Sequence, residues 1–313
     1  MISATYGATT HVGQVRTGNE DSYIAIDGLY FVADGMGGHR AGEVASDIAV
    51  RTLAEIYLSQ SSPLTSPGLV SDAISTANTA IYMEAMHDPN KNGMGTTLTG
   101  LVVTNPLENK IVVANVGDSR TYLWRHNELH QVTKDHSHVQ TLVDRGVISR
   151  AEARVHFQRN IVLRAMGIDS WVLADVEGKI VEDGDRYILC SDGLVDEADD
   201  AEIENEIRAS VSAQDLSDRL VNLANRNGGR DNITVVVVDF DVVPNEPITT
   251  PEGNQPIEST VESESIAESV RNVEPPSSTT SPSPWFRVGA YAMWLAAAAI
   301  TVTVIISAIT SAQ

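Results

Sequence analysis

The chain has 313 residues, a formal net charge of −21 and one cysteine. This excess of acids excludes sequence-nonspecific binding of nucleic acid, whose phosphates are bound by clustered Lys and Arg, so we expect no nucleic-acid partner. A single cysteine excludes an internal disulfide and a thiolate metal cage, and it agrees with a reducing compartment.

Apolar and β-branched runs predict buried strands, and apolar residues at helical spacing predict helices. In chain order, the predicted strands cover residues 29–33, 96–103, 111–116, 187–190 and 233–240, and the predicted helices cover residues 44–59, 70–86, 137–144, 150–157 and 215–225. The pairs Asp27-Gly28 and Asp183-Gly184 are typical of turns. The pattern by itself predicts a mixed α and β domain over residues 1–241.

Four aspartates stand in short polar segments beside apolar runs. Asp34, Asp118 and Asp192 each follow a predicted strand, whereas Asp231 precedes one. Hard cations such as Mg²⁺ and Mn²⁺ prefer carboxylate and carbonyl oxygens, and glycine lets a backbone carbonyl approach an ion. Carboxylates gathered in one cleft would repel by about 4 kcal/mol per close pair, so their convergence requires a cation.

Together these segments resemble the metal-dependent protein phosphatases of the type 2C family, in their compact bacterial form, over residues 3–241. The resemblance rests on six segments in the family's order: VRTGNED (15–21), VADGMGGH (32–39), MGTT (94–97), NVGDSR (115–120), LCSDG (189–193) and RDN (230–232). A chance match to one glycine-rich loop could not reproduce this series.

The resemblance implies a site for two divalent ions, Mn²⁺ or Mg²⁺. Asp34 would bridge the two ions, and the carbonyl of Gly35 would contact the second. Asp192 and Asp231 would complete the shell of the first ion. Many bacterial members hold a third ion with the aspartate that aligns with Asp118, which would share Asp192.

The resemblance also assigns three residues that do not ligate the ions directly. Glu20 and Asp21 would orient waters bound to the ions, and Arg16 would grip the substrate phosphate. Arginine suits this role because its planar guanidinium binds phosphate through two parallel hydrogen bonds. The ions would activate a water for attack on the phosphoryl group, so no covalent phosphoenzyme is expected.

The family's fold is α+β, a four-layer αββα sandwich of two antiparallel β-sheets flanked by helices, with the metals in the cleft at one end of the sheets. Two positions depart from the family's pattern. Met36 stands where animal members often place a histidine thought to protonate the leaving group, which leaves a metal-bound water or His39 as candidate acids. Phe157 stands where many relatives carry proline, and we expect altered dynamics of this flap-like segment at most.

Other chemistries conflict with the residues. A cysteine-based phosphatase needs an arginine six positions after its nucleophile, yet Asp196 occupies that place after Cys190. The segment at Asp34 lacks the Gly-Lys-Ser/Thr of a phosphate-cradling nucleotide loop. His136 and His138 alternate as zinc ligands on a strand do, but they lie in a predicted loop without partners, which favours a surface position.

The composition changes after residue 241. Residues 242–284 hold seven glutamates, one arginine and many Ser, Thr and Pro, which predicts a flexible acidic linker or a docking segment for a partner. Residues 288–309 carry no charge over 22 positions, enough at about 1.5 Å per residue to span a hydrocarbon core of about 30 Å. We therefore expect residues 285–313 to form a single-pass transmembrane anchor, with the catalytic domain on the cytoplasmic side of the cell membrane.

The leading hypothesis is a membrane-tethered protein serine/threonine phosphatase that acts on phosphorylated proteins and opposes a Ser/Thr kinase. Two alternatives stay open. A catalytically silent phosphoprotein-binding module would keep the fold without the chemistry, but retention of Arg16, Asp34 and Asp192 argues against it. Hydrolysis of a small phosphorylated metabolite would use the same chemistry, because substrate choice depends on the shape of the surface.

Overall fold

The computed structural model describes residues 1–37, 41–59 and 64–243. The chain divides into two compact units, Met1–Thr249 and Thr250–Gln313, and the described residues lie in the first. The linker beyond residue 243, the predicted span at 288–309 and His39 lie outside the described residues. In the part that is described, no helix combines the length and the apolar character needed to cross a membrane.

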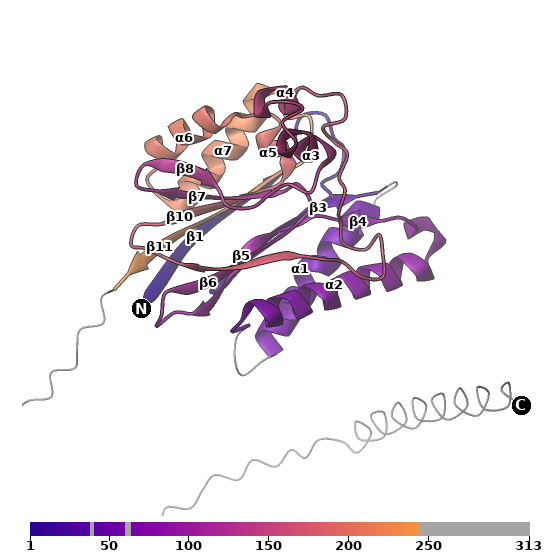
Figure 1. Ribbon diagram of the computed structural model, residues 1–313, viewed down its shortest axis with the longest axis horizontal. Helices are drawn as coiled ribbons and strands as arrows, with labels where there is room; N and C mark the ends of the chain where they lie inside the picture. The colour runs from indigo at the N-terminus through magenta and orange to yellow at the C-terminus, as the bar shows by residue number, and fades with distance from the viewer. Residues whose placement is uncertain (38–40, 60–63, 244–313) are drawn as a thin grey trace, which may run out of the picture. The chain divides into compact units, whose positions relative to one another are not determined.

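Two antiparallel sheets form the centre of the domain (Figure 1). The first has the order β1 (Ile2–His11), β11 (Ile233–Val242), β10 (Arg186–Cys190), β7 (Arg120–Arg125) and β8 (Glu128–Gln131). The second has the order β2 (Asp21–Ile26), β3 (Leu29–Met36), β5 (Leu98–Asn105), β6 (Lys110–Val116) and β9 (Asp175–Ile180), and the short β4 (Gly95–Thr96) pairs with β3.

Helices flank both sheets (Figure 1). The second sheet packs against α1 (Ala41–Ser59) and α2 (Pro67–His87), which is followed by the 3₁₀ turn η1 (Pro89–Lys91). The first sheet packs against α5 (Asp192–Val195), α6 (Asp200–Ala209) and α7 (Ala213–Asn227). The connection from β8 to β9 contains α3 (His138–Asp144) and α4 (Arg150–Arg154).

Three apolar clusters fill the spaces between these layers. Phe31 packs toward α1 and α2, whereas its neighbour Tyr30 belongs to the cluster between the sheets. Likewise Leu189 lies between the sheets and Ile188 faces α5 to α7. Successive side chains on a strand point to opposite faces, so each central strand supplies two clusters. The expected α+β fold, with two antiparallel sheets flanked by helices, is therefore confirmed.

Every strand and helix predicted from the apolar pattern is present, with shifted ends. β3 was expected to end before Asp34, but it continues to Met36 because Gly35 and Met36 pair with β4. The helix predicted at 150–157 ends at Arg154. The two-residue turn before β3 is confirmed, with Gly28 at a φ of 82° that glycine adopts without strain.

Candidate active site

A cavity of about 240 Å³ opens where the ends of the two sheets meet. Its lining includes seven of the eight site residues assigned from the sequence: Arg16, Glu20, Asp34, Gly35, Asp118, Asp192 and Asp231. The eighth, Asp21, is buried beside it. The sequence did not single out four further lining residues: Thr97, Asn160, Val162 and Asn232.

The four aspartates meet because the strands that carry them alternate in direction. β3, β6 and β10 run toward this edge of the sandwich, so Asp34 lies near the end of its strand, and Asp118 and Asp192 follow theirs. β11 is antiparallel to β10 and runs away from the edge, so Asp231 precedes its strand. The position of each aspartate relative to its strand follows from the antiparallel topology.

Asp34 is fixed through its backbone. Its N–H donates to Thr97 Oγ1 at 3.0 Å, and its carbonyl accepts from the Thr97 N–H and from Thr96 Oγ1, both at 2.9 Å. At the next position, a Cβ on Gly35 would stand 2.2 Å from the carbonyl oxygen of Gly42, so a side chain has no room. These contacts leave the Asp34 carboxylate available to a ligand.

Asp192 begins α5, and the serine before it links the two sheets. Ser191 Oγ donates to Asp21 Oδ2 at 2.8 Å and accepts from the Thr234 N–H at 3.0 Å. Among the described residues, the other oxygen of Asp21 is buried without a hydrogen-bond partner. Burial raises the pKa of Asp21 to about 6. A buried acceptor without a protein partner fits a residue that holds water near an ion.

Arg16 and Asp231 form an ion pair at the mouth of the cavity. Arg16 Nη2 lies 2.8 Å from Asp231 Oδ2, and 51% of the Arg16 side chain is exposed. An exposed pair of this kind contributes about 0–1 kcal/mol, so either partner can exchange it for a stronger one.

Asn232 holds the loop that carries Arg16 and Glu20. Its Nδ2 donates to the carbonyls of Val12 and Gly18, both at 2.9 Å, and its Oδ1 accepts from the Glu20 N–H at 2.8 Å. The residue belongs to the RDN segment used for the resemblance, but its role as a clamp was not predicted. The available signal was an asparagine directly before an apolar strand, where burial requires amide partners.

Asp118 follows a turn that is fixed from two sides. Gly117 has a φ of 103°, and a Cβ there would approach Thr97 Cγ2 to 2.6 Å. The Gly117 N–H donates to His136 Nδ1 at 3.0 Å, and its carbonyl accepts from the His136 N–H at 2.9 Å. The expected surface position of His136 was wrong, because these bonds and Asp175, 3.1 Å from Nε2, satisfy the ring in a buried place.

The cavity concentrates negative charge that Arg16, the only basic residue in its lining as described, compensates only in part. Burial raises the pKa of Asp34 and of Asp192 well above the usual value, and nearby aspartates, including Asp118, raise both further. Burial, followed by the charge of Asp135, raises the pKa of Asp118 to about 7. The carboxylates of Asp34, Asp118 and Asp192 are therefore costly to ionise unless a cation is bound.

The donor set fits a hard divalent cation. Every acidic group in the lining offers carboxylate oxygen, and no thiolate lines the cavity, which suits Mg²⁺ or Mn²⁺. Within residues 1–37, 41–59 and 64–243, no three His, Cys, Asp or Glu side chains are already gathered as ligands of one ion.

Cys190 and Met36, which lie in or near this region, cannot serve as a nucleophile and as a general acid, respectively. Cys190 is buried, and burial raises the pKa of its thiol to about 12, so the reactive thiolate is not available. Met36 lines the cavity and carries no exchangeable proton. The site therefore offers no cysteine nucleophile and no general acid at position 36.

Known proteins are similar to this chain in sequence and fold. The family model described as Protein phosphatase 2C matches residues 17–234. The serine/threonine protein phosphatase PstP of Mycobacterium tuberculosis is 41% identical over 251 residues, which cover 78% of this chain and 47% of that protein. The chain thus spans about half of PstP. The serine/threonine phosphatase stp of Listeria welshimeri is 38% identical over 75% of this chain and 95% of that protein.

Solved structures agree with the sequence matches. A crystal structure of Mycobacterium tuberculosis PstP/Ppp matches with a TM-score of 0.70 and 39% identity, covering 77% of this chain and 100% of that one. A structure of the PstP catalytic domain in complex with two manganese ions matches with a TM-score of 0.70 and 37% identity, with the same coverage. The family match spans all four aspartates of the cavity, and the chain belongs to the protein phosphatase 2C family.

Proposed function

We propose that this chain is a metal-dependent protein serine/threonine phosphatase that hydrolyses phosphoserine and phosphothreonine with two Mn²⁺ or Mg²⁺ ions. One observation carries the proposal: Asp34, Asp192 and Asp231 line a single cavity together with Arg16. Relatives named as serine/threonine phosphatases, and the manganese complex of one of them, support it. A silent binding module would gain nothing from keeping these carboxylates together in a buried cavity.

Different residues of the chain would bind the ions and the water. Asp34, the Gly35 carbonyl, Asp192 and Asp231 would hold the two ions, and Asp118 with Asp192 would hold a third. When bound, the ions supply charge that lowers the pKa of a water and offsets the charge on the phosphoryl oxygens.

Glu20 lines the cavity, and Asp21 lies buried beside it. The unpartnered oxygen of Asp21 is an acceptor for water in this buried region. Its position behind the cavity allows it to orient such a water without taking a place among the ligands.

Arg16 would bind the substrate phosphate after leaving Asp231. Its side chain is half exposed, and its one hydrogen-bond partner among the described residues is that carboxylate. A cation at Asp231 competes for the same oxygens and frees Arg16 for two parallel hydrogen bonds to phosphate. Positioning and electrostatics of this kind are sufficient for phosphoryl transfer to water.

Hydrolysis of a phosphothreonine peptide by residues 1–249 tests the proposal. Turnover with Mn²⁺ or Mg²⁺ is expected, and a chelator should abolish it. Asp34→Asn should also abolish turnover, whereas Asp72→Asn, an equal change at an exposed position of α2, should not. Turnover that survives the chelator or Asp34→Asn would refute the proposed site.

The substrate class needs a separate comparison. We propose phosphorylated proteins, including a Ser/Thr kinase and its substrates, because the relatives are named as serine/threonine protein phosphatases. Phosphopeptides and free phosphorylated metabolites should be compared by kcat/KM. A higher efficiency on metabolites would contradict the protein substrate while leaving the chemistry intact.

We further propose that the chain is held in the cell membrane by residues 288–309, with the catalytic domain in the cytoplasm. The support is the uncharged length of that segment. The full chain should sediment with membranes, and residues 1–249 should stay in the supernatant. Equal distribution of the two between the fractions would contradict the anchor.

A further inference from the structure

A second cavity, of about 340 Å³, adjoins the candidate active site. It lies among α3, α4, α5 and α6 and shares Asp118, Asn160 and Asp192 with the lining of the first cavity. A chain bound at the catalytic cavity can therefore continue into this one. Figure 1 shows α3, α4 and α5 close together above the ends of the sheets.

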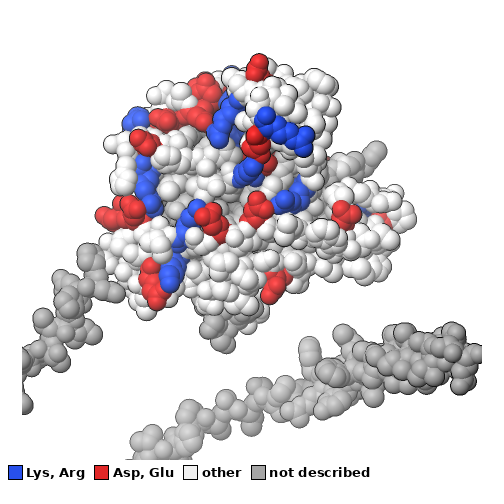
Figure 2. Space-filling view, in the orientation of Figure 1, with Lys and Arg blue, Asp and Glu red and all other residues white. Residues whose placement is uncertain are grey.

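The wall of this cavity combines apolar, basic and acidic groups, and its acidic members are six aspartates: Asp118, Asp135, Asp192, Asp196, Asp199 and Asp200. Its apolar members are small or branched side chains: Val139, Val143, Ala151, Ala153, Val195 and Ala201. Its basic members are four arginines: Arg120, Arg150, Arg154 and Arg159. On the face shown in Figure 2, Lys and Arg side chains near this part of the domain are interspersed with acids.

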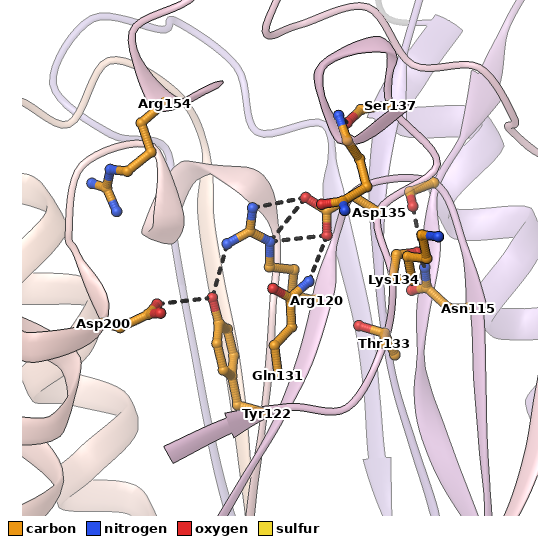
Figure 3. A network of polar contacts seen from close by, with 12 residues as sticks. Asn115, Arg120, Tyr122, Gln131, Thr133, Lys134, Asp135, Ser137, Arg154 and Asp200 are labelled. Atoms are coloured by element: carbon orange, nitrogen blue, oxygen red, sulfur yellow. Dashed lines mark hydrogen bonds and ion pairs between the residues drawn. The ribbon is translucent and has the colours of Figure 1, made fainter. Parts of the chain in front are cut away.

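The four arginines differ in whether they already form an ion pair with a carboxylate of the domain. Arg120 donates to both oxygens of Asp135 and also to the hydroxyl of Tyr122, so it is fully committed (Figure 3). Arg159 lies 3.5 Å from an oxygen of Asp196, at the long end of an ion pair. These two arginines have carboxylate partners.

The arginines of α4 have none in the described part of the chain. Arg154 donates to the main-chain carbonyl of Ala198 at 3.0 Å, and Figure 3 shows it apart from the Arg120–Asp135 pair. Arg150 makes no ion pair or side-chain hydrogen bond with a described residue, although its charge, after the hydrogen bonds from Lys134 and Gln140, helps to lower the pKa of Asp144. Arg150 and Arg154 both line the cavity, and both are exposed residues.

Local acids do not neutralise this segment. Residues 134–164 contain six Lys or Arg and three Asp or Glu, in a chain whose net charge is −21. Each of the three acids is already engaged: Asp135 with Arg120, Asp144 with Lys134, and Glu152 with Ser149 at the start of α4.

Two further acids of the cavity, Asp199 and Asp200 at the start of α6, already accept hydrogen bonds. Asp199 accepts the Glu202 N–H at 2.9 Å as the helix cap, and Asp200 accepts from the Tyr122 hydroxyl at 3.4 Å. Asp200 is therefore only weakly engaged, but it belongs to α6 and makes no ion pair with either arginine of α4 in the described structure. Within the described residues, the positive charge of the wall that lacks an ion-pair partner lies on α4, and the corresponding negative charge lies at the start of α6, on Asp199 and Asp200.

We propose that this cavity receives the acidic residues that flank the phosphorylated serine or threonine of a protein substrate, with Arg150 and Arg154 as the residues that select them. The inference rests on the proposed phosphatase function and names a substrate preference for it. An acidic side chain next to an apolar one would match both the guanidinium groups and the apolar wall. Pairs at such a rim steer association and select partners more than they add affinity.

The test compares two phosphothreonine peptides that differ only in having glutamates or glutamines beside the phosphorylated residue. Residues 1–249 are suitable, because they form one compact unit and relatives of that length exist as whole proteins. Each rate is normalised to hydrolysis of para-nitrophenyl phosphate by the same variant. We expect kcat/KM to favour the acidic peptide roughly 10-fold at low salt, and the preference to shrink as salt rises.

Two variants locate the preference. Arg150→Gln combined with Arg154→Gln should reduce the ratio of the two peptides to near 1. Arg145→Gln removes an equal charge from an exposed residue between α3 and α4 that does not line the cavity, and it should leave the ratio unchanged. A preference that persists in the double variant would overturn the proposal, as would an equal loss in Arg145→Gln or equal rates of the wild type on both peptides.

Two further results separate the alternatives. If no phosphoester is hydrolysed, the proposed function fails. The inference is then tested by measuring, with fluorescence anisotropy, the binding of the same peptides without phosphate. Acid-selective binding that the double variant loses would support it, and its absence would overturn it. If a peptide of residues 250–284 binds this cavity more tightly than the acidic phosphopeptide does, the cavity binds the chain's own segment. This result would overturn the proposal that it binds the substrate.

Discussion

Replacing Asp118 with asparagine should stabilise the metal-free domain, although Asp118 is a candidate ligand. Its pKa is raised from 3.8 to about 7, first by burial and then by the charge of Asp135. An acid whose pKa is raised on folding contributes its stability below its unfolded pKa and loses it as the pH rises through its folded pKa. At about 1.4 kcal/mol per pKa unit, Asp118 costs the fold about 4 kcal/mol at pH 8, where it is ionised in the folded state, and about 2 kcal/mol at pH 5, where it must take up a proton on folding.

Urea unfolding with chelator, followed by circular dichroism, measures this cost. Asp118→Asn should raise the free energy of unfolding by about 4 kcal/mol at pH 8 and by about half of that at pH 5. Asp72→Asn, at an exposed position, should change neither value. Saturating Mn²⁺ should reduce or reverse the gain, because the cation then offsets the charge. A variant no more stable than the wild type at pH 8, or a gain independent of pH, would refute the reasoning.

Three more substitutions test the geometry of the site. Gly35→Ala should lower the free energy of unfolding by about 1–3 kcal/mol in urea, because its Cβ would overlap backbone oxygens 2.2 and 2.4 Å away; an unchanged value would mean that the loop yields. Asn232→Ala should cost about 1–3 kcal/mol in the same assay, because it leaves backbone groups at the loop unpartnered. Arg16→Ala should raise KM for a phosphopeptide about tenfold while the thermal midpoint stays within a few degrees, since its ion pair is exposed. A normal KM would remove Arg16 from the phosphate site.

The sequence was most informative where the chain is buried and regular. The strands around Phe31 and Val236 are apolar throughout because layers cover both of their faces, and such runs are visible in one dimension. β1 was missed because it lies at the edge of its sheet, where polar residues such as Thr5 and Thr10 alternate with less polar ones. α6 was missed for a related reason, since only Ile203 and Ile207 of its residues are buried.

The candidate ligands were predictable for a different reason. Each aspartate stands at the boundary of an apolar run, and the segments around the aspartates match a known family. The residue types of the ligands and the order of their segments could therefore be read from the sequence. Contacts between distant segments were not. Asn232 clamps a loop more than 200 residues earlier in the chain, and His136 fixes the turn at Gly117 through its ring and its backbone. Neither pairing leaves a periodic trace in the sequence.

The cavity must hold like charges together before any ion arrives, and neutral hydrogen bonds between the sheets allow this. Ser191, at the end of β10 in the first sheet, donates to Asp21, the first residue of β2 in the second. Deeper in the sandwich, Thr99 of β5 and Thr121 of β7 join their hydroxyls at 2.9 Å. Hydroxyl groups tie the sheets without adding positive charge, whereas a lysine or arginine at these positions would pair with the carboxylates. In the described structure Asp34 and Asp192 form no ion pair with a lysine or arginine, so their charge remains available to a divalent ion.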